Sequence, residues 1–174
     1  MSKCILRPAT LADAETLGHI GVATFVESYT HEIEGSAMMA HCTHEHSKSA
    51  YEKYLAKPDT GCWIAAHPET RAPIGYALNC TPDLPIETFS DDIELKRIYV
   101  LSTYHGKGIA AALLQASIDH ALKTNNKRLL LGTYEDNHRA MAFYAKFNFT
   151  TIGTRQFNIG GKLFDDIIMS KHLD

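Results

Sequence analysis

The stretch Val100–Leu114, VLSTYHGKGIAAALL, decides the fold of this chain. It predicts the end of a strand, a tight glycine turn and a helix whose apolar residues recur at helical spacing. Gly106 and Gly108 have no side chains, so the backbone there can approach a ligand closely. The first N–H groups of a helix are unpaired and carry partial positive charge. The stretch therefore predicts that a phosphorylated ligand binds at the start of this helix.

Length and composition bound the class of protein. The 174 residues fit one domain, 1–174, that buries a core without disulfides or a metal. The chain is 45% hydrophobic and 21% charged, which is typical of a soluble globular protein. A formal net charge of -3 gives no support to nucleic-acid binding. No apolar run approaches the roughly 20 residues of a membrane span. We expect no nucleic-acid or membrane partner.

The cysteines and the N-terminus indicate the compartment. The four cysteines are widely spaced and form no CxxC pair, which favours reduced thiols over a disulfide framework. The first residues, MSKCILRPAT, lack the apolar core and cleavage site of a signal peptide. A cytoplasmic location is the expectation.

Hydrophobic periodicity and turn residues place the other elements. We expect the order strand, two helices, three strands, helix, strand, helix and two strands. The expected strands are Cys4–Arg7, Cys62–Ala66, Ile74–Cys80, Ile93–Val100, Arg128–Thr133, Thr150–Asn158 and Lys162–Lys171. The expected helices follow a capping box at Thr10 and Asp13, cover Ser49–Lys57, run from the glycine turn to about Thr124, and cover Asn137–Phe147. Glu27–Ser49 is expected to be polar and irregular. Strand–helix–strand units predict an α/β fold with a mixed sheet and parallel central strands.

The glycine turn fits neither common nucleotide-binding motif. Ala111 stands where GxGxxG has its last glycine, and the P-loop needs Lys and then Ser or Thr after its second glycine. By itself the turn is equally compatible with a purely structural strand–helix connection.

A second segment, Asn137–Phe149 (NHRAMAFYAKFNF), gives the turn a family context. Together with His105–Ala110 (HGKGIA) it resembles the GNAT family of acetyl-coenzyme A-dependent N-acetyltransferases. The family motifs are Gln/Arg-x-x-Gly-x-Gly/Ala and Asn-x-x-Ala-x-x-Phe-Tyr-x-x-x-Gly/Asn-Phe. His105 departs from the usual first residue. The resemblance covers the whole chain and implies a mostly antiparallel sheet with flanking helices and a parallel pair at the fourth and fifth strands.

The resemblance also implies how the cofactor is held. Backbone N–H groups of the turn would cradle the pyrophosphate of acetyl-coenzyme A. The backbone of Ile98 and Val100 would bind the pantetheine arm, as a neighbouring strand would. Asn137 would cap its helix and contact that arm, and Lys146 would reach a phosphate unless it is simply solvated. The expected cofactor-binding residues are Ile98, Val100, His105, Gly106, Lys107, Gly108, Ile109, Ala110, Asn137 and Lys146.

Transfer to an amine requires two proton movements, which implies two catalytic groups. Tyr144 resembles the general acid of the family, which protonates the departing thiolate; the alternative is a core tyrosine. Glu94 stands where several members place a carboxylate that accepts the amine proton through water; the alternative is a solvent-facing strand residue. Lys96 and Arg97 are expected to be solvated charges rather than catalysts.

The run His41–His46 invites a metal interpretation. His41 and His44 could share a helical face, whereas His46 would point elsewhere, and no distant His or Cys pair completes a tetrahedral site. We therefore expect no metal, and a polar loop or helix beside the acceptor.

Three further segments resemble the PaiA-type spermidine/spermine N-acetyltransferases: TFVESYTHEI at 24–33, the stretch 94–110, and FNIGGKLFDDIIMSKHL at 157–173. This resemblance implies that the acceptor is a cationic small-molecule amine, and a polyamine is the leading candidate. Acidic groups suited to such an acceptor are Glu27, Glu32, Glu34, Glu87, Asp91, Asp92 and Glu94. A peptide N-terminus, an amino-sugar antibiotic and a non-catalytic acetyl-coenzyme A sensor stay open as alternatives. The family also implies a possible homodimer.

Overall fold

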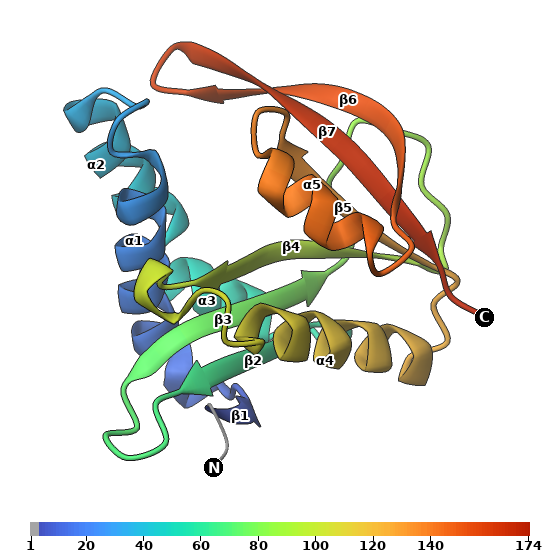
Figure 1. Ribbon diagram of the computed structural model, residues 1–174, viewed down its shortest axis with the longest axis horizontal. Helices are drawn as coiled ribbons and strands as arrows, with labels where there is room; N and C mark the ends of the chain where they lie inside the picture. Colours follow the sequence, from blue (N-terminus) through green and yellow to red (C-terminus); the bar gives the residue numbers. More distant parts are fainter. Residues whose placement is uncertain (1–3) are drawn as a thin grey trace.

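A computed structural model describes residues 4–174 of the chain (Figure 1). Seven strands form one sheet in the order β1-β2-β3-β4-β5-β7-β6. They are Ile5–Pro8 (β1), Gly61–Ala66 (β2), Pro73–Cys80 (β3), Asp92–Val100 (β4), Arg128–Tyr134 (β5), Thr150–Ile159 (β6) and Lys162–His172 (β7). In this sheet β4 and β5 are parallel and the other neighbours are antiparallel. The predicted mixed sheet and its parallel pair are confirmed.

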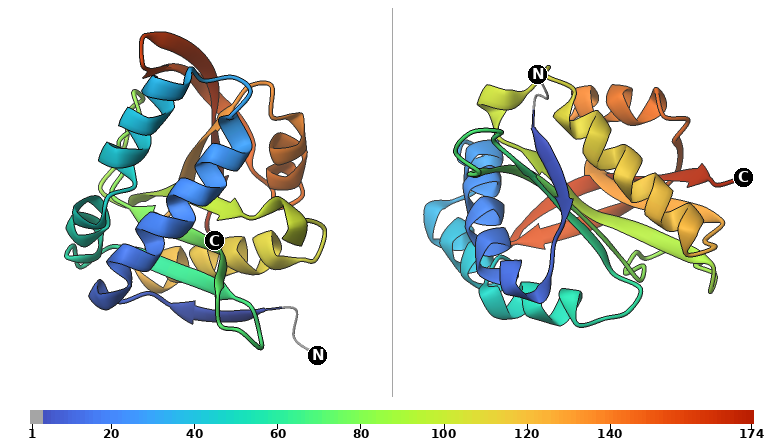
Figure 2. Two further views of the ribbon diagram at one scale, coloured as in Figure 1. Left: turned by 90° about the vertical axis from the view of Figure 1, so that its left-hand side faces the viewer. Right: turned by 90° about the horizontal axis from the view of Figure 1, so that it is seen from below.

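Helices cover both faces of the sheet (Figure 2). They are Ala14–Tyr29 (α1), Gly35–Glu45 (α2), Lys48–Leu55 (α3), Ile109–Lys123 (α4) and His138–Ala145 (α5), with short 3₁₀ turns at Leu11–Asp13 (η1) and Ser102–Tyr104 (η2). Residues of α4 and α5 share the largest apolar cluster with one sheet face. Residues of α1 and α3 share a second cluster with the opposite face. The core therefore has two layers, separated by the sheet.

The prediction that Glu27–Ser49 is irregular is wrong, because α1 continues to Tyr29 and α2 lies within this range. The carboxylate of Glu34 caps α2 by accepting two backbone hydrogen bonds at its first turn. Met38 and Cys42, four residues apart, are buried against the β6–β7 hairpin. Two apolar positions on a polar segment give only a weak periodic signal, which explains why the sequence did not predict the helix. Tertiary packing of these two positions, in part against the hairpin, stabilises it.

Element ends differ slightly from those predicted. Strand β1 begins and ends one residue later, α3 ends at Leu55 rather than Lys57, and α5 ends at Ala145 rather than Phe147. The capping box is confirmed, since the N–H of Thr10 donates to Asp13 at 2.8 Å. The expectation of no signal peptide concerns in part residues 1–3, which lie outside the described range. Within residues 4–174, no helix has the length and apolar character needed to cross a bilayer.

The parallel pair β4 and β5 is short, and this opens the sheet. The two strands pair only over Asp92–Glu94 and Arg128–Leu130. Beyond that point β4 continues beside β3 to Val100, while β5 continues beside β7 to Tyr134. Figure 1 shows the two strands starting side by side and then spreading apart. One backbone edge of β4 therefore has no strand partner over its second half within the described chain.

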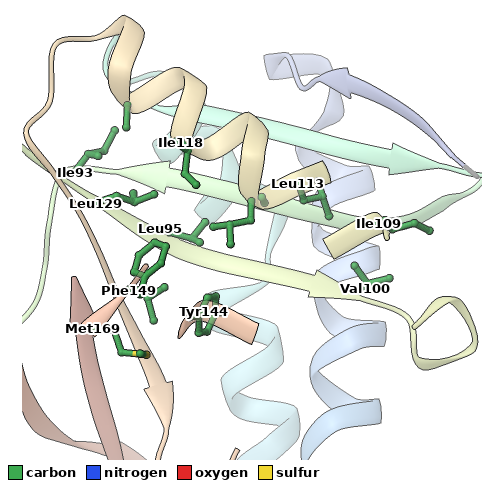
Figure 3. Packing of buried hydrophobic residues seen from close by; sticks show 14 of the residues in the cluster. Ile93, Leu95, Val100, Ile109, Leu113, Ile118, Leu129, Tyr144, Phe149 and Met169 are labelled. Atoms are coloured by element: carbon green, nitrogen blue, oxygen red, sulfur yellow. The ribbon is translucent and has the colours of Figure 1, made fainter. Parts of the chain in front are cut away.

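A bulge in β4 decides which side chains face each layer. Leu95 pairs with β3, and the next paired residue of β4 is Arg97, so Lys96 is the extra residue. Before the bulge Leu95 packs into the α4–α5 layer, and after it Ile98 and Val100 do so. Figure 3 shows the β4 side chains Leu95 and Val100 in this layer with residues of α4. Arg97 and Tyr99 therefore face the α1–α3 layer.

Candidate active site

A cleft of about 820 Å³ lies where β4 and β5 spread apart, and side chains from both faces of the sheet line it. We divide it into two halves. The α4–α5 half is lined by Ile98, Val100, His105, Ala110, Thr133, Asn137, Ala140, Phe143 and Tyr144. The α1–α2 half is lined by Phe25, Tyr29, Glu32, His41, Glu45, His46, Arg97, Tyr99, Tyr134, Arg155, Phe164 and Asp166.

The glycine turn leads into the α4–α5 half and fits an anionic group. Gly106 and Gly108 have φ angles of 72° and 80°, in the left-handed region that favours glycine. Within residues 4–174, no atom other than those of the adjoining backbone lies within 4 Å of a Cβ built at either position, so a ligand can approach the backbone there. The first backbone hydrogen bond of α4 runs from Ala112 N to Gly108 O at 3.1 Å. The preceding N–H groups of the helix therefore remain available for a phosphate.

The free edge of β4 presents backbone groups to the same half. Leu101 N donates to Ile74 O of β3 at 2.9 Å. Because backbone groups alternate along a strand, those of Ile98 and Val100 point the other way, toward the cleft. The carbonyl of Val100 accepts a hydrogen bond from Nε2 of His105 at 2.7 Å, which ties the turn to the strand. His105, the unusual first residue of the cofactor motif, therefore has a hydrogen-bond partner in β4.

Tyr144 contributes a buried phenol to the α4–α5 half. It lies on α5, whose start is capped by Asn137 Oδ1 accepting from Ala140 N at 3.0 Å. The ring is 7% exposed and packs with Phe149 at a centroid distance of 5.8 Å. Figure 3 shows both side chains beside Leu95 of β4. Burial and the nearby Tyr99 raise the pKa of Tyr144 well above its usual value, so its O–H is a proton donor at neutral pH.

Buried ions and phenols build the α1–α2 half. Asp166 is 8% exposed, and its Oδ2 accepts from Arg155 Nε at 2.9 Å. A Cβ at Gly132 would come within 2.9 Å of Arg155 Nη2, so this glycine makes room for the guanidinium. The phenols of Tyr29 and Tyr99 lie close enough to shift each other's pKa.

The sequence interpretation missed these four side chains as site residues. One signal could have found Asp166. It occupies a core-facing position between Phe164 and Ile168 in the alternation of β7, where a charged residue needs a reason.

Arg97 is buried, so the expectation of a solvated charge is wrong for it. It is 8% exposed, and its Nη2 donates to Glu45 Oε2 at 3.0 Å. Its guanidinium lies over the rings of Tyr51 and Tyr54, at 5.1 and 5.6 Å from their centroids. The bulge at Lys96 turns Arg97 toward α2 and α3, where these partners hold it.

The histidines of α2 lie differently from the prediction. His41 stacks on Phe25 at 4.5 Å and lines the cleft together with His46, whereas the side chain of His44 is 86% exposed. His46 Nδ1 lies 3.0 Å from the hydroxyl of Tyr51, and burial lowers the pKa of His46 to about 3. Among residues 4–174 no three His, Cys, Asp or Glu side chains are grouped as a metal site.

The side chain of Glu94 does not line either half of the cleft. It is 2% exposed, so the solvent-facing alternative is wrong. Its Oε2 accepts from Asp83 N at 2.7 Å, and its Oε1 lies 3.4 Å from Lys96 Nζ. Both oxygens are thus engaged within the sheet and the neighbouring loop. Its role as general base stays a prediction.

Other predicted residues lie apart from the cleft. Lys146, at the C-terminal end of α5, lines a separate hollow of about 390 Å³. Lys107 lies over the ring of Tyr104 at 4.7 Å, beside the turn. Glu27 accepts hydrogen bonds from the N–H and hydroxyl of Ser102. Of the seven acidic candidates for binding the acceptor, Glu32 is the member that lines the cleft.

Comparison with known proteins agrees with this geometry. Residues 15–149 match the sequence model of the acetyltransferase (GNAT) family. An uncharacterized N-acetyltransferase of Mycobacterium bovis is 30% identical over 163 residues, covering 94% of this chain and 99% of that protein. A spermine/spermidine N(1)-acetyltransferase of Bacillus subtilis is 29% identical over 87 residues, which cover 49% of this chain and 57% of that protein.

Among solved structures, the PaiA N-acetyltransferase of Thermoplasma acidophilum in complex with coenzyme A matches with a TM-score of 0.78. The two are 20% identical, and the match covers 99% of both chains. The splayed strands, the glycine turn and the family match lead to one conclusion: this chain belongs to the GNAT family and is an acetyl-coenzyme A-dependent N-acetyltransferase.

Proposed function

We propose that the protein acetylates a primary amine of a small cationic molecule, with a polyamine such as spermidine or spermine as the leading acceptor. The observation that carries this proposal is the cleft itself, which connects a backbone edge and Tyr144 on one face of the sheet with carboxylates on the other. The donor enters from the α4–α5 half and the acceptor from the α1–α2 half.

The residues of the α4–α5 half hold the donor. Acetyl-coenzyme A, when bound, supplies an acetyl group activated as a thioester. The free N–H groups at the start of α4 bind the pyrophosphate, and the partial positive charge of the helix end adds to this attraction. The cleft-facing backbone of Ile98 and Val100 binds the pantetheine arm and so aims the acetyl group into the gap between the strands.

The proton movements then follow from the chemistry of amide formation. The acceptor ammonium first loses a proton to become a nucleophile, because an amine with a pKa of about 10 is rarely neutral at pH 7. Its nitrogen lone pair forms the bond to the acetyl carbon, and the carbon–sulfur bond breaks. The departing sulfur takes the proton of the Tyr144 hydroxyl. Tyr144 regains a proton from the acetylated nitrogen, which must lose a second proton to become a neutral amide. The products are the amide, the thiol of coenzyme A and one proton released to solvent.

A pair of carboxylates supports an acceptor with more than one ammonium group. The hydroxyl of Tyr134 donates to Asp136 Oδ2 at 3.1 Å, and the nearby carboxylate of Glu32 acts on the same phenol. Partial burial and these two contacts raise the pKa of Tyr134 to about 12. Neither carboxylate pairs with Lys or Arg in the described part of the chain. The spermine/spermidine acetyltransferase relative is consistent with such an acceptor.

The proposal is tested by measuring thiol release from acetyl-coenzyme A with a panel of amines. The panel contains spermidine, spermine, propylamine, an amino-sugar antibiotic and a short peptide with a free N-terminus. We expect the highest kcat/KM with spermidine or spermine. A preference for the peptide or the amino sugar would contradict the polyamine assignment. Binding of acetyl-coenzyme A without turnover of any amine would favour a sensor instead.

A further inference from the structure

Asp166 is a buried carboxylate with no part in the proton transfers proposed above. It stands in β7 opposite Tyr134 of β5 and Arg155 of β6, at the wall of the cleft. A carboxylate that is 8% exposed needs a cation or several donors to offset the loss of hydration. Arg155 contacts Oδ2 at 2.9 Å, and none of the described residues donates a hydrogen bond to Oδ1. One oxygen is therefore left for a ligand.

The surroundings of Asp166 suit a positive group. Its negative charge acts on the two neighbouring phenols Tyr29 and Tyr99, which line the cleft with it. Tyr99 is also close enough to Tyr144 to raise the pKa of Tyr144. These phenols are neutral at neutral pH, so their oxygens and ring faces favour a cation beside the carboxylate. Asp166 thus lines the same cleft as Tyr99 and Tyr144, beside the gap between β4 and β5.

The other cleft carboxylates near β4 are engaged differently. Glu45 is bound to the guanidinium of Arg97, which two aromatic rings also hold in place. Asp83 is 92% exposed and interacts with Lys96 at 3.6 Å. Asp166 differs from both because it combines deep burial with a free oxygen and a partner whose guanidinium end lies against Gly132, which has no side chain.

We propose that Asp166 binds the reacting ammonium group of the acceptor, and that Arg155 competes with the acceptor for this carboxylate. The inference rests on the proposed transfer to an amine and names the residue that positions the nitrogen. An ammonium–carboxylate contact is a charge-assisted hydrogen bond, which is stronger than one between neutral groups. While no amine is bound, the Arg155 guanidinium partly offsets the negative charge of the carboxylate.

The test uses three variants of the full chain and reads KM for the amine against kcat. Asp166→Asn keeps the shape but removes the charge, and we expect KM for spermidine to rise at least about tenfold while acetyl-coenzyme A affinity is unchanged. Arg155→Gln should lower KM for the amine, because it removes the competitor. The double variant should retain the raised KM.

A purely structural pair predicts a different pattern. If Asp166 only neutralises Arg155, the double variant restores the wild-type KM, and Arg155→Gln alone does not lower it; either result overturns the inference. Calorimetry with coenzyme A shows that each variant is folded. The comparison uses whichever panel amine the wild-type protein acetylates, so propylamine serves if spermidine fails. Loss of the polyamine assignment is then distinct from loss of the Asp166 role. Absence of turnover with every amine overturns both.

Discussion

We propose that the two halves of the cleft recognise their ligands by different means. The α4–α5 half presents the glycine turn, the cleft-facing backbone of Ile98 and Val100, and a single phenol at Tyr144. The α1–α2 half uses buried charges, above all Arg97 with Glu45 and Arg155 with Asp166. Backbone groups suit a donor that many enzymes share. Paired side chains from distant segments suit an acceptor that differs from one enzyme to the next.

The largest expected effect concerns the phenol of the α4–α5 half. Tyr144→Phe keeps the buried ring but removes the only proton that we assign to the departing sulfur. General acid catalysis contributes about 10²–10⁴-fold, so kcat should fall by about 10²-fold or more. Thiol-release kinetics measure the loss, and calorimetry should find unchanged affinity for coenzyme A. A variant with wild-type kcat would remove Tyr144 from the chemistry.

The next effect tests whether backbone conformation holds the donor. Gly108→Val forces a branched residue into a φ of 80°, which costs about 1–3 kcal/mol. We expect coenzyme A to bind about 10- to 100-fold more weakly, because the N–H cradle is distorted. Gly161→Val is the matched control: Gly161 has φ 92° and equally open space, but lies in the β6–β7 turn. Equal coenzyme A affinities for the two variants would contradict the cradle.

Sequence reasoning was strongest where the ligand contacts are local. The turn and the Asn137–Phe149 segment each form one contiguous motif, so the α4–α5 half could be predicted. The α1–α2 half could not, because Tyr29, Tyr99 and Asp166 come from three distant elements and meet only after the sheet has formed. The direction in which each side chain of β4 points could also not be predicted, because no residue type in the sequence marks the bulge that turns Arg97 inward.

The helix α2 teaches the same lesson about packing. Its two buried positions, Met38 and Cys42, share a cluster with Phe25 of α1 and with Ile159 and Phe164, which come from a hairpin more than a hundred residues away. A local pattern cannot contain that information. Three expectations stay predictions. They are a single domain over residues 1–174, a cytoplasmic location and a homodimer.

A smaller effect separates the two candidate carboxylates. Glu94→Gln should lower kcat less than about tenfold, below the usual range for losing a general base, because Glu94 is bound to Asp83 N and does not line the cleft. The amine KM should also stay close to that of the wild-type protein, in contrast to Asp166→Asn. If kcat instead fell a hundredfold at constant KM, Glu94 would be the base that the family resemblance implies.

The smallest expected effect is a loss of folding stability at acidic pH that comes from His46 in the α1–α2 half. Burial lowers the pKa of His46 to about 3 from its usual 6.5, so below pH 6.5 the unfolded chain binds more protons than the folded one. Stability contributed by this residue is present above pH 6.5 and is lost as the pH falls. We expect about 1 kcal/mol less stability at about pH 5.5 than at about pH 7 from this group. Urea unfolding of the wild-type protein and of His46→Gln measures it. Identical pH dependence in both would refute the assignment.

Entry of donor and acceptor from opposite faces of the sheet is the central feature of the proposed mechanism. A crystal structure with coenzyme A and spermidine bound tests this directly. The account predicts the pantetheine arm along Ile98 and Val100 in the α4–α5 half, and an amine nitrogen within hydrogen-bond distance of Asp166 in the α1–α2 half. Both ligands in the same half, or spermidine remote from Asp166, would contradict it.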